Sequence, residues 1–126
     1  MVQLTKIALD TNMLMAIGEL KIDVFEEIKN QIANPEFFVP EAVIEELQAL
    51  KKINRTKKIN AEIAEILIKK HCKIIKNKEK KADKIMEELA EENYIIATND
   101  KKLRTKIRKK GFKTAFVRQK KMIVIE

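Results

Sequence analysis

The stretch Ile7-Ala8-Leu9-Asp10-Thr11-Asn12 places an acidic residue directly after a short apolar run, and it decides the fold class of this chain. The arrangement repeats farther along, where Tyr94–Ala97 is followed by Thr98-Asn99-Asp100. A short apolar run bounded by polar turn residues predicts a buried strand. In open parallel sheets, functional groups collect beyond the carboxyl ends of the strands. We therefore expect Asp10 and Asp100 to lie at the same edge of one sheet.

The segments around these two strands alternate between strand and helix patterns. Strands are expected at 4–9, 37–39, 73–76, 94–97 and 114–117, with a further edge strand at 122–125. Helices are expected near 13–16, 22–33, 43–50, 59–70, 85–90 and 101–110, with Asn12 as the cap of the first and a loop or a helix start at 77–81. This alternation predicts an α/β fold in which helices cover both faces of a parallel sheet. The whole chain, 1–126, is expected to form a single domain.

The chain has 27 Lys and Arg residues against 19 Asp and Glu residues, a formal net charge of +8. Carboxylates gathered at one sheet edge repel one another unless a divalent cation or bound protons offset their charge. A negative pocket on a positive protein suggests a metal site that cuts a polyanion. Abundant charges of both signs also mark proteins of hyperthermophiles, so heat tolerance is the alternative explanation of the basic excess.

Several functional classes are excluded by composition. A single cysteine, Cys72, allows no internal disulfide and agrees with a reducing cytoplasm, and one cysteine with one histidine, His71, cannot form a zinc site of those two residue types. Two glycines are too few for a glycine-rich nucleotide loop. No apolar run approaches the about 18 residues of a membrane span, and charged residues interrupt the N-terminal apolar stretches. We expect a cytoplasmic protein without a membrane partner.

Two further acidic residues are singled out by their places on predicted helices. Glu46 lies beside the stripe that Val43 and Leu47 define at about 100° per residue, so its carboxylate needs compensation. Asp83 lies at the margin of the apolar stripe of the helix near 85–90. Each acid also has a structural alternative: Asp10 as a turn or cap residue, Glu46 as a solvated side chain, Asp83 and Asp100 as acids at a helix start. Asn12, Thr98 and Asn99 add amide and hydroxyl groups to the same pocket.

The helix predicted at 101–110 is strongly basic and begins beside Asp100. Its basic residues are Lys101, Lys102, Arg104, Lys106, Arg108, Lys109 and Lys110. Lys101, Lys102, Arg104 and Arg108 are the candidates for holding nucleic-acid phosphates, which gives affinity without sequence choice. The alternative is a helix face that is merely solvated.

Taken in order, these motifs resemble the PIN domain of metal-dependent ribonucleases over essentially the whole chain. The motifs are Asp10-Thr11-Asn12, Val43-Ile44-Glu45-Glu46-Leu47, Ala82-Asp83 and Thr98-Asn99-Asp100-Lys101-Lys102-Leu103. The resemblance implies a three-layer α/β/α fold with about five parallel strands and an acidic pocket at their carboxyl ends. It also implies that Asp10, Glu46, Asp83 and Asp100 hold Mg²⁺ or Mn²⁺ and catalyse RNA hydrolysis. Many members carry a second Asp where this chain has Lys84.

Within the family, two groups are similar to this chain: the VapC-like toxins, particularly archaeal ones, and the Fcf1/Utp24-like nucleases of ribosomal RNA processing. The first is favoured because the chain stops soon after the core. It implies an antitoxin as partner, and homodimers are common in the family. An inactive RNA-binding module remains an alternative. Receiver domains and Asp-nucleophile phosphatases are disfavoured, because the first strand is followed by neither adjacent acids nor Asp-x-Asp.

Overall fold

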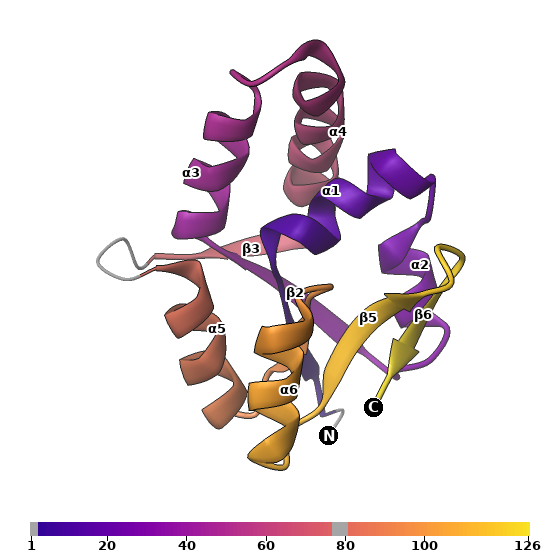
Figure 1. Cartoon of the computed structure of the whole chain (residues 1–126). Coiled ribbons are helices and arrows are strands. Elements are labelled where there is room, and N and C mark those ends of the chain that lie inside the picture. Colours follow the sequence, from indigo (N-terminus) through magenta and orange to yellow (C-terminus); the bar gives the residue numbers. More distant parts are fainter. Residues whose placement is uncertain (1–2, 77–80) are drawn as a thin grey trace.

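The computed structural model describes residues 3–76 and 81–126, and a six-stranded sheet in the order β3-β2-β1-β4-β5-β6 runs through its centre (Figure 1). The strands are β1 (Thr5–Leu9), β2 (Pro35–Pro40), β3 (Cys72–Ile75), β4 (Ile95–Ala97), β5 (Thr114–Arg118) and β6 (Met122–Ile125). The first five are parallel, as the sequence predicts, and the expected edge strand β6 pairs antiparallel with β5. The sheet is therefore mixed rather than purely parallel.

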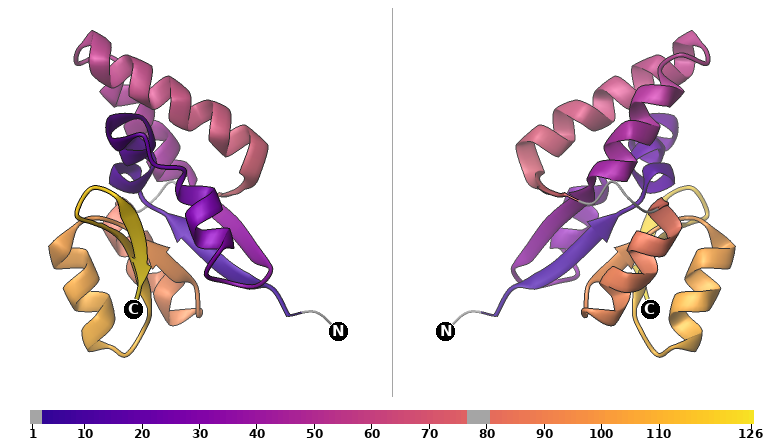
Figure 2. Two further views of the ribbon diagram at one scale, coloured as in Figure 1. Left: turned by 90° about the vertical axis from the view of Figure 1, so that its right-hand side faces the viewer. Right: turned by 90° about the vertical axis from the view of Figure 1, so that its left-hand side faces the viewer.

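The helices form a layer on each side of the sheet. The first group is α1 (Thr11–Leu20), α2 (Val24–Lys29), α3 (Glu41–Leu50) and α4 (Arg55–His71), and the second is α5 (Ala82–Glu91) and α6 (Lys101–Lys109). Connections between parallel strands are right-handed, so the face that a helix covers depends on the direction in which the chain steps across the sheet. The chain steps one way from β1 to β3 and the other way from β3 to β5, which separates the two groups (Figure 2). The three-layer α/β/α prediction is confirmed.

The centre of the sheet is buried on both faces. Ile7, Ala8 and Leu9 of β1 have no exposed surface, and neither do Ile96 and Ala97 of β4. Such strands read as continuous apolar runs because helices cover both of their sides. Their register pairs Leu9 with Ala97, so the polar residues that follow the two strands emerge side by side.

Some helix limits differ from the sequence prediction. Asp10, not Asn12, caps α1: its carboxylate accepts from the Thr11 N–H, so the helix begins at Thr11. The second helix covers only Val24–Lys29. Helix α4 begins at Arg55 rather than near 59, because the Asn54 side chain caps it by accepting from the Lys57 N–H. The loop or helix start predicted at 77–81 falls almost entirely outside the described residues.

Helices α1 and α4 approach each other closely at Gly18. A Cβ atom at this position would lie 2.4 Å from Asn60 Oδ1 and 3.3 Å from Asn60 Cα, so a larger residue does not fit without movement of α4. Along α4, the buried residues Asn60, Ala61 and Ala64 form the face toward α1. In the described part of the chain, no helix is both long and apolar enough to cross a membrane.

The two edges of the sheet differ. On β6, the outward-facing Ile123 N–H donates to Glu27 Oε1 at 3.1 Å, and the Ile123 carbonyl accepts from Gln31 Nε2 at 2.7 Å, so side chains from α2 and from the turn after it cover this edge at Ile123. At the opposite edge, β3 carries Ile74 with 54% of its surface exposed.

Candidate active site

A cavity of about 340 Å³ opens at the carboxyl ends of the central strands. It is lined by Asp10, Thr11, Asn12, Met15, Glu19, Glu46, Leu50, Lys57, Asp83 and Asp100. The connections that follow the neighbouring strands β1 and β4 lie on opposite faces of the sheet, and such a switch point is where α/β sheets bind ligands. All four acids singled out from the sequence lie at this cavity, brought there by β1, α3, α5 and β4.

Asp10 is the buried carboxylate of the cavity, with 5% of its surface exposed. Its Oδ1 accepts from the Thr11 N–H at 2.8 Å, and its Oδ2 accepts from the Thr98 hydroxyl at 2.9 Å. Burial raises the pKa of Asp10 to about 6, the two hydrogen bonds oppose this rise, and the nearby charges of Glu46 and Asp83 add to it. A charged Asp10 is therefore costly in this site until a cation offsets it.

The polar residues after β4 join the ends of three strands. Besides donating to Asp10, the Thr98 hydroxyl accepts from the Asp100 N–H at 3.1 Å. The Asn99 N–H donates to Asn12 Oδ1 at 2.8 Å, and Asn99 Oδ1 accepts from the Val117 N–H at 2.8 Å. Of the three accessory residues predicted from the sequence, Asn12 lines the cavity. Thr98 and Asn99 do not line it, but they hydrogen-bond to the lining residues Asp10 and Asn12.

Glu46 and Asp83 reach the cavity from two helices on opposite faces of the sheet. Glu46 Oε1 accepts a hydrogen bond from the Thr11 hydroxyl, which links α3 to the first turn of α1. Both carboxylates are otherwise exposed. Lys84, the residue after Asp83, is exposed and does not line the cavity.

Asp100 caps the helix that follows it. Its Oδ1 accepts from the Lys102 N–H at 2.9 Å and from the Leu103 N–H at 3.3 Å. The helix-cap alternative considered from the sequence is thus present in the structure, and the same side chain also lines the cavity. One carboxylate oxygen orients the helix start, so the whole group is held in place at the cavity wall.

The donor chemistry of the cavity fits a hard divalent cation. Five carboxylates line it, those of Asp10, Glu19, Glu46, Asp83 and Asp100, and Mg²⁺ and Mn²⁺ prefer such oxygen ligands. Among residues 3–76 and 81–126, no three acidic, His or Cys side chains lie close enough together to hold an ion as they stand. Glu46 and Asp83 are exposed, so their side chains would have room to turn toward Asp10 if a cation were to bind.

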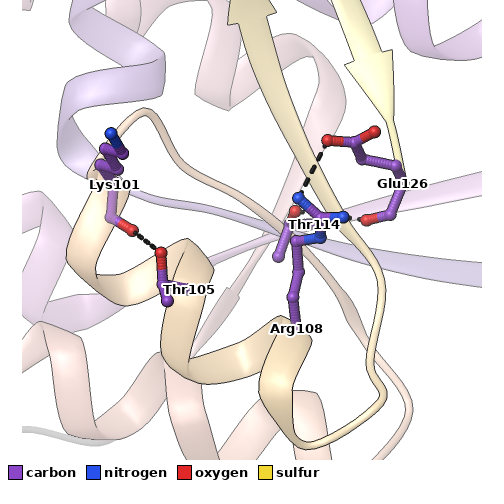
Figure 3. Close-up of polar contacts among 5 residues, drawn as sticks. All are labelled: Lys101, Thr105, Arg108, Thr114 and Glu126. Atoms are coloured by element: carbon purple, nitrogen blue, oxygen red, sulfur yellow. Dashed lines mark hydrogen bonds and ion pairs between the residues drawn. The ribbon is translucent and has the colours of Figure 1, made fainter.

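The basic helix α6 is fastened to the body of the protein by two of its arginines. The Arg104 guanidinium stacks 4.0 Å from the centre of the Phe116 ring. Arg108 Nη1 lies 3.0 Å from Glu126 Oε1 (Figure 3). Lys101 and Lys102 are exposed. Of the four residues predicted to contact RNA, these two lysines are the ones without an ion pair or ring partner in the described structure.

Three polar residues of the cavity are not among the site residues predicted from the sequence: Thr11, Glu19 and Lys57. Glu19 is one helical turn beyond Met15, which also lines the cavity. The first helix was predicted only near 13–16, so the prediction did not include Glu19. Lys57 precedes the helix predicted at 59–70, although the helix-capping residue Asn54 three positions earlier is a signal for an earlier helix start.

Comparisons with known proteins agree with this architecture. Ribonuclease VapC9 from Archaeoglobus fulgidus is 24% identical over 117 residues, which cover 93% of this chain and 86% of the relative. The structure of the PIN domain endonuclease Utp24 matches with a TM-score of 0.76 and 26% identity over 96% of this chain and 90% of that one. A chain of VapBC2 from Rickettsia felis, solved with a DNA fragment from the promoter, matches in fold with a TM-score of 0.56 and 17% identity over 80% of this chain and 92% of that one.

The family model described as a PIN-like domain matches residues 7–120. That span runs from β1 to the turn before β6 and includes every residue that lines the cavity. With this match, we conclude that the chain belongs to the PIN-like domain family.

Proposed function

We propose that this chain is an endoribonuclease that depends on Mg²⁺ or Mn²⁺ held by Asp10, Glu46, Asp83 and Asp100. The observation that supports this proposal is the convergence of these four carboxylates, from four separate elements, on one cavity at the switch point of the sheet. Such a gathering of negative charge opposes folding unless it has a ligand. The remainder of the chain is basic, which suits a polyanionic substrate.

The residues around Asp10 preorganise the site. The Thr11 N–H and the Thr98 hydroxyl hold one oxygen each, so the carboxylate has a single orientation in which to meet a cation. A bound divalent ion would supply an activated water and offset the charge that develops on the phosphate. The expected products carry a 5′-phosphate and a 3′-hydroxyl.

RNA is the proposed substrate because the relatives and the charge distribution point the same way. VapC9 is named a ribonuclease and Utp24 an endonuclease. The exposed side chains of Lys101 and Lys102 begin α6 directly after Asp100, where they can contact phosphates on either side of a cleaved bond. Contacts of this kind give affinity that depends on salt rather than on sequence.

For the biological role, we propose a VapC-like toxin whose partners are an antitoxin protein and a second copy of the chain. This role is supported by the similarity to VapC9 and to the VapBC2 chain. A role in ribosomal RNA processing is the second candidate, and the higher TM-score with Utp24 favours it. A toxin stops growth when expressed alone and is neutralised by its antitoxin. An RNA-processing nuclease is distinguished by precursor ribosomal RNA that accumulates when it is depleted.

The activity is tested by incubating single-stranded and structured RNA with the wild type and Asp10→Asn in Mg²⁺, Mn²⁺ or EDTA. We expect metal-dependent cleavage by the wild type and a loss of at least about a hundredfold in the variant. Asp23→Asn is the matched control, since Asp23 caps α2 by accepting a 3.0 Å hydrogen bond from the Glu26 N–H and does not line the cavity. RNA binding without cleavage under any of these conditions would instead identify an inactive RNA-binding module.

A further inference from the structure

Lys57 is a cation in the wall of the acidic cavity. It lies in the first turn of α4, and of the ten residues that line the cavity it is the one with a positive charge, against five carboxylates. We propose that the Lys57 ammonium binds a non-bridging oxygen of the phosphate that is cleaved. This inference rests on the proposed function, because it assigns a role within the same site.

The packing of α4 on α1 determines the position of Lys57. Lys57 is half-buried, whereas the next residue, Lys58, is exposed. Lys57 precedes the buried Asn60 and Ala61 by three and four positions, so it shares their face of α4. That face lies against α1 at Gly18, where the helices are too close to admit a Cβ atom. The stem of Lys57 is therefore directed toward the cavity that α1 also lines through Met15 and Glu19.

The Lys57 ammonium remains available for a ligand. Among the described residues, no carboxylate lies within 4.0 Å of its nitrogen, although five share its cavity. Elsewhere on the molecule, lysines near acids do form pairs: Lys73 Nζ lies 2.7 Å from Glu36 Oε2, and Lys51 pairs with Glu65. Lys57 thus does not serve as the counter-charge of a particular acid.

A phosphodiester needs a positive group of this kind in addition to the carboxylates. Carboxylates bind cations and repel the phosphate itself, so a group that contacts the phosphate directly must come from another residue type. An ammonium offers three donors and a full charge, and lysine is a common phosphate ligand. Negative charge grows on the non-bridging oxygens as the new bond forms, and a fixed donor in a partly enclosed site stabilises it.

The alternative is that Lys57 merely makes the electrostatic potential of the cavity less negative. Under that alternative, Lys57→Met binds Mn²⁺ more tightly, contacts RNA no more weakly than the wild type, and cleaves at least as fast. A phosphate ligand behaves differently: its removal weakens RNA contact and slows cleavage, while the Mg²⁺ concentration that gives half of the maximal rate does not rise.

The test compares the wild type, Lys57→Met, Lys57→Arg and Lys58→Met on one 5′-labelled single-stranded RNA. Single-turnover cleavage is measured across Mg²⁺ concentrations, and RNA binding is measured in EDTA across salt concentrations. We expect Lys57→Met to lower the cleavage rate by about tenfold to a hundredfold. We also expect it to reduce the slope of log affinity against log salt by about 0.7, the value for one phosphate contact on a single strand. Lys57→Arg keeps the charge and should retain most of the slope, and Lys58→Met should match the wild type.

A Lys57→Met variant that cleaves within threefold of the wild type overturns the assignment. If the wild type does not cleave RNA at all, the proposed function fails, and the salt slopes then decide the inference alone. A slope reduced in Lys57→Met but not in Lys58→Met supports a phosphate contact, and equal slopes reject it. Should Lys57→Met not fold, the comparison of Lys57→Arg with Lys57→Gln replaces it under the same criteria.

Discussion

The Thr98 hydroxyl donates a hydrogen bond of 2.9 Å to Asp10 Oδ2, and this contact joins the ends of two adjacent parallel strands. The two residues are 88 positions apart, yet the pairing of Leu9 with Ala97 makes them neighbours. Both side chains are buried. The contact therefore fixes the orientation of the carboxylate on which the proposed metal site depends.

Replacing Thr98 with Val should destabilise the fold by about 1–3 kcal/mol, because Asp10 Oδ2 and the Asp100 N–H both lose a buried partner. Urea unfolding measures the change. Thr105→Val is the control: its hydroxyl also makes a 2.8 Å hydrogen bond, to the Lys101 carbonyl, but on an exposed turn of α6 (Figure 3). We expect the control to cost less than about 0.5 kcal/mol. Equal effects of the two substitutions would contradict a special role for Thr98.

Stability should depend on pH through Asp10. The folded state raises the pKa of this carboxyl from 3.8 to about 6, so the folded chain holds the proton more tightly than the unfolded chain. Stability from this group is therefore lost as pH rises, with the full cost present above about pH 6 and little cost below about pH 4. In EDTA, we expect the wild type to lose about 2 kcal/mol between pH 4.5 and 7.5 relative to Asp10→Asn. Urea unfolding at both pH values tests this, and parallel profiles would reject it.

A divalent cation should reverse that cost. An ion that binds only the folded chain stabilises it, by about 2.7 kcal/mol at a hundred times its dissociation constant. We expect Mg²⁺ or Mn²⁺ at pH 7.5 to raise the melting temperature of the wild type and of Asp23→Asn. Asp10→Asn and Glu46→Gln should show a smaller rise, as measured by differential scanning calorimetry. A rise of the same size in all four proteins would place the metal outside this cavity.

Gly18→Ala should destabilise the chain, although alanine is ordinarily the better helix former by about 1 kcal/mol. The added Cβ would meet Asn60 Oδ1 at 2.4 Å, and forcing α1 and α4 apart should cost about 1–3 kcal/mol. Asn60→Ala removes the atom that is struck, so the double variant should be less destabilised than the sum of the two single variants. Additive effects in a double-mutant cycle would show that the two positions do not interact.

The lysines that begin α6 should contribute more to RNA binding than those near its end. Lys101→Gln with Lys102→Gln should reduce the salt slope of binding to single-stranded RNA by about 1.4, for two lost phosphate contacts. Lys109→Gln with Lys113→Gln removes the same charge from exposed positions, one at the last residue of α6 and one beyond it, and should change the slope much less. Equal losses would mean that α6 and its surroundings attract RNA only through overall charge.

The layers of the fold could be predicted because the apolar runs in the sequence coincide with the buried strands of the structure. The apolar runs at 7–9 and 95–97 are strands buried on both faces, and such strands read as unbroken apolar sequence. The antiparallel direction of β6 was not predicted, because four apolar residues at an edge carry no sign of direction. It follows from the short turn after β5, since neighbouring strands joined by a tight turn must be antiparallel.

Strand ends and helical phase were enough to predict the four acidic residues of the site. Contacts between residues distant in the sequence could not be predicted. Both Asp10 and Asn12 are good helix caps, and the choice between them depends on the bond from the Asp10 N–H to the Ala97 carbonyl, a contact distant in sequence. The pairing of Arg108 with Glu126 is also distant, so Arg108 looks free in the sequence. Lys57 enters the cavity through the packing of α4 on α1, which no local pattern predicts.

The unequal edges of the sheet limit how far copies of this chain can associate through their strands. At β6, the Glu27 and Gln31 side chains occupy the backbone groups of Ile123 that a foreign strand would need. Of the two edge strands in the described sheet, β3 is therefore the one left for strand addition. If the β3 strands of two copies pair with each other, neither copy has a free edge strand left for a third. Assembly of this chain by pairing of edge strands would thus stop at a dimer and could not extend into a fibre.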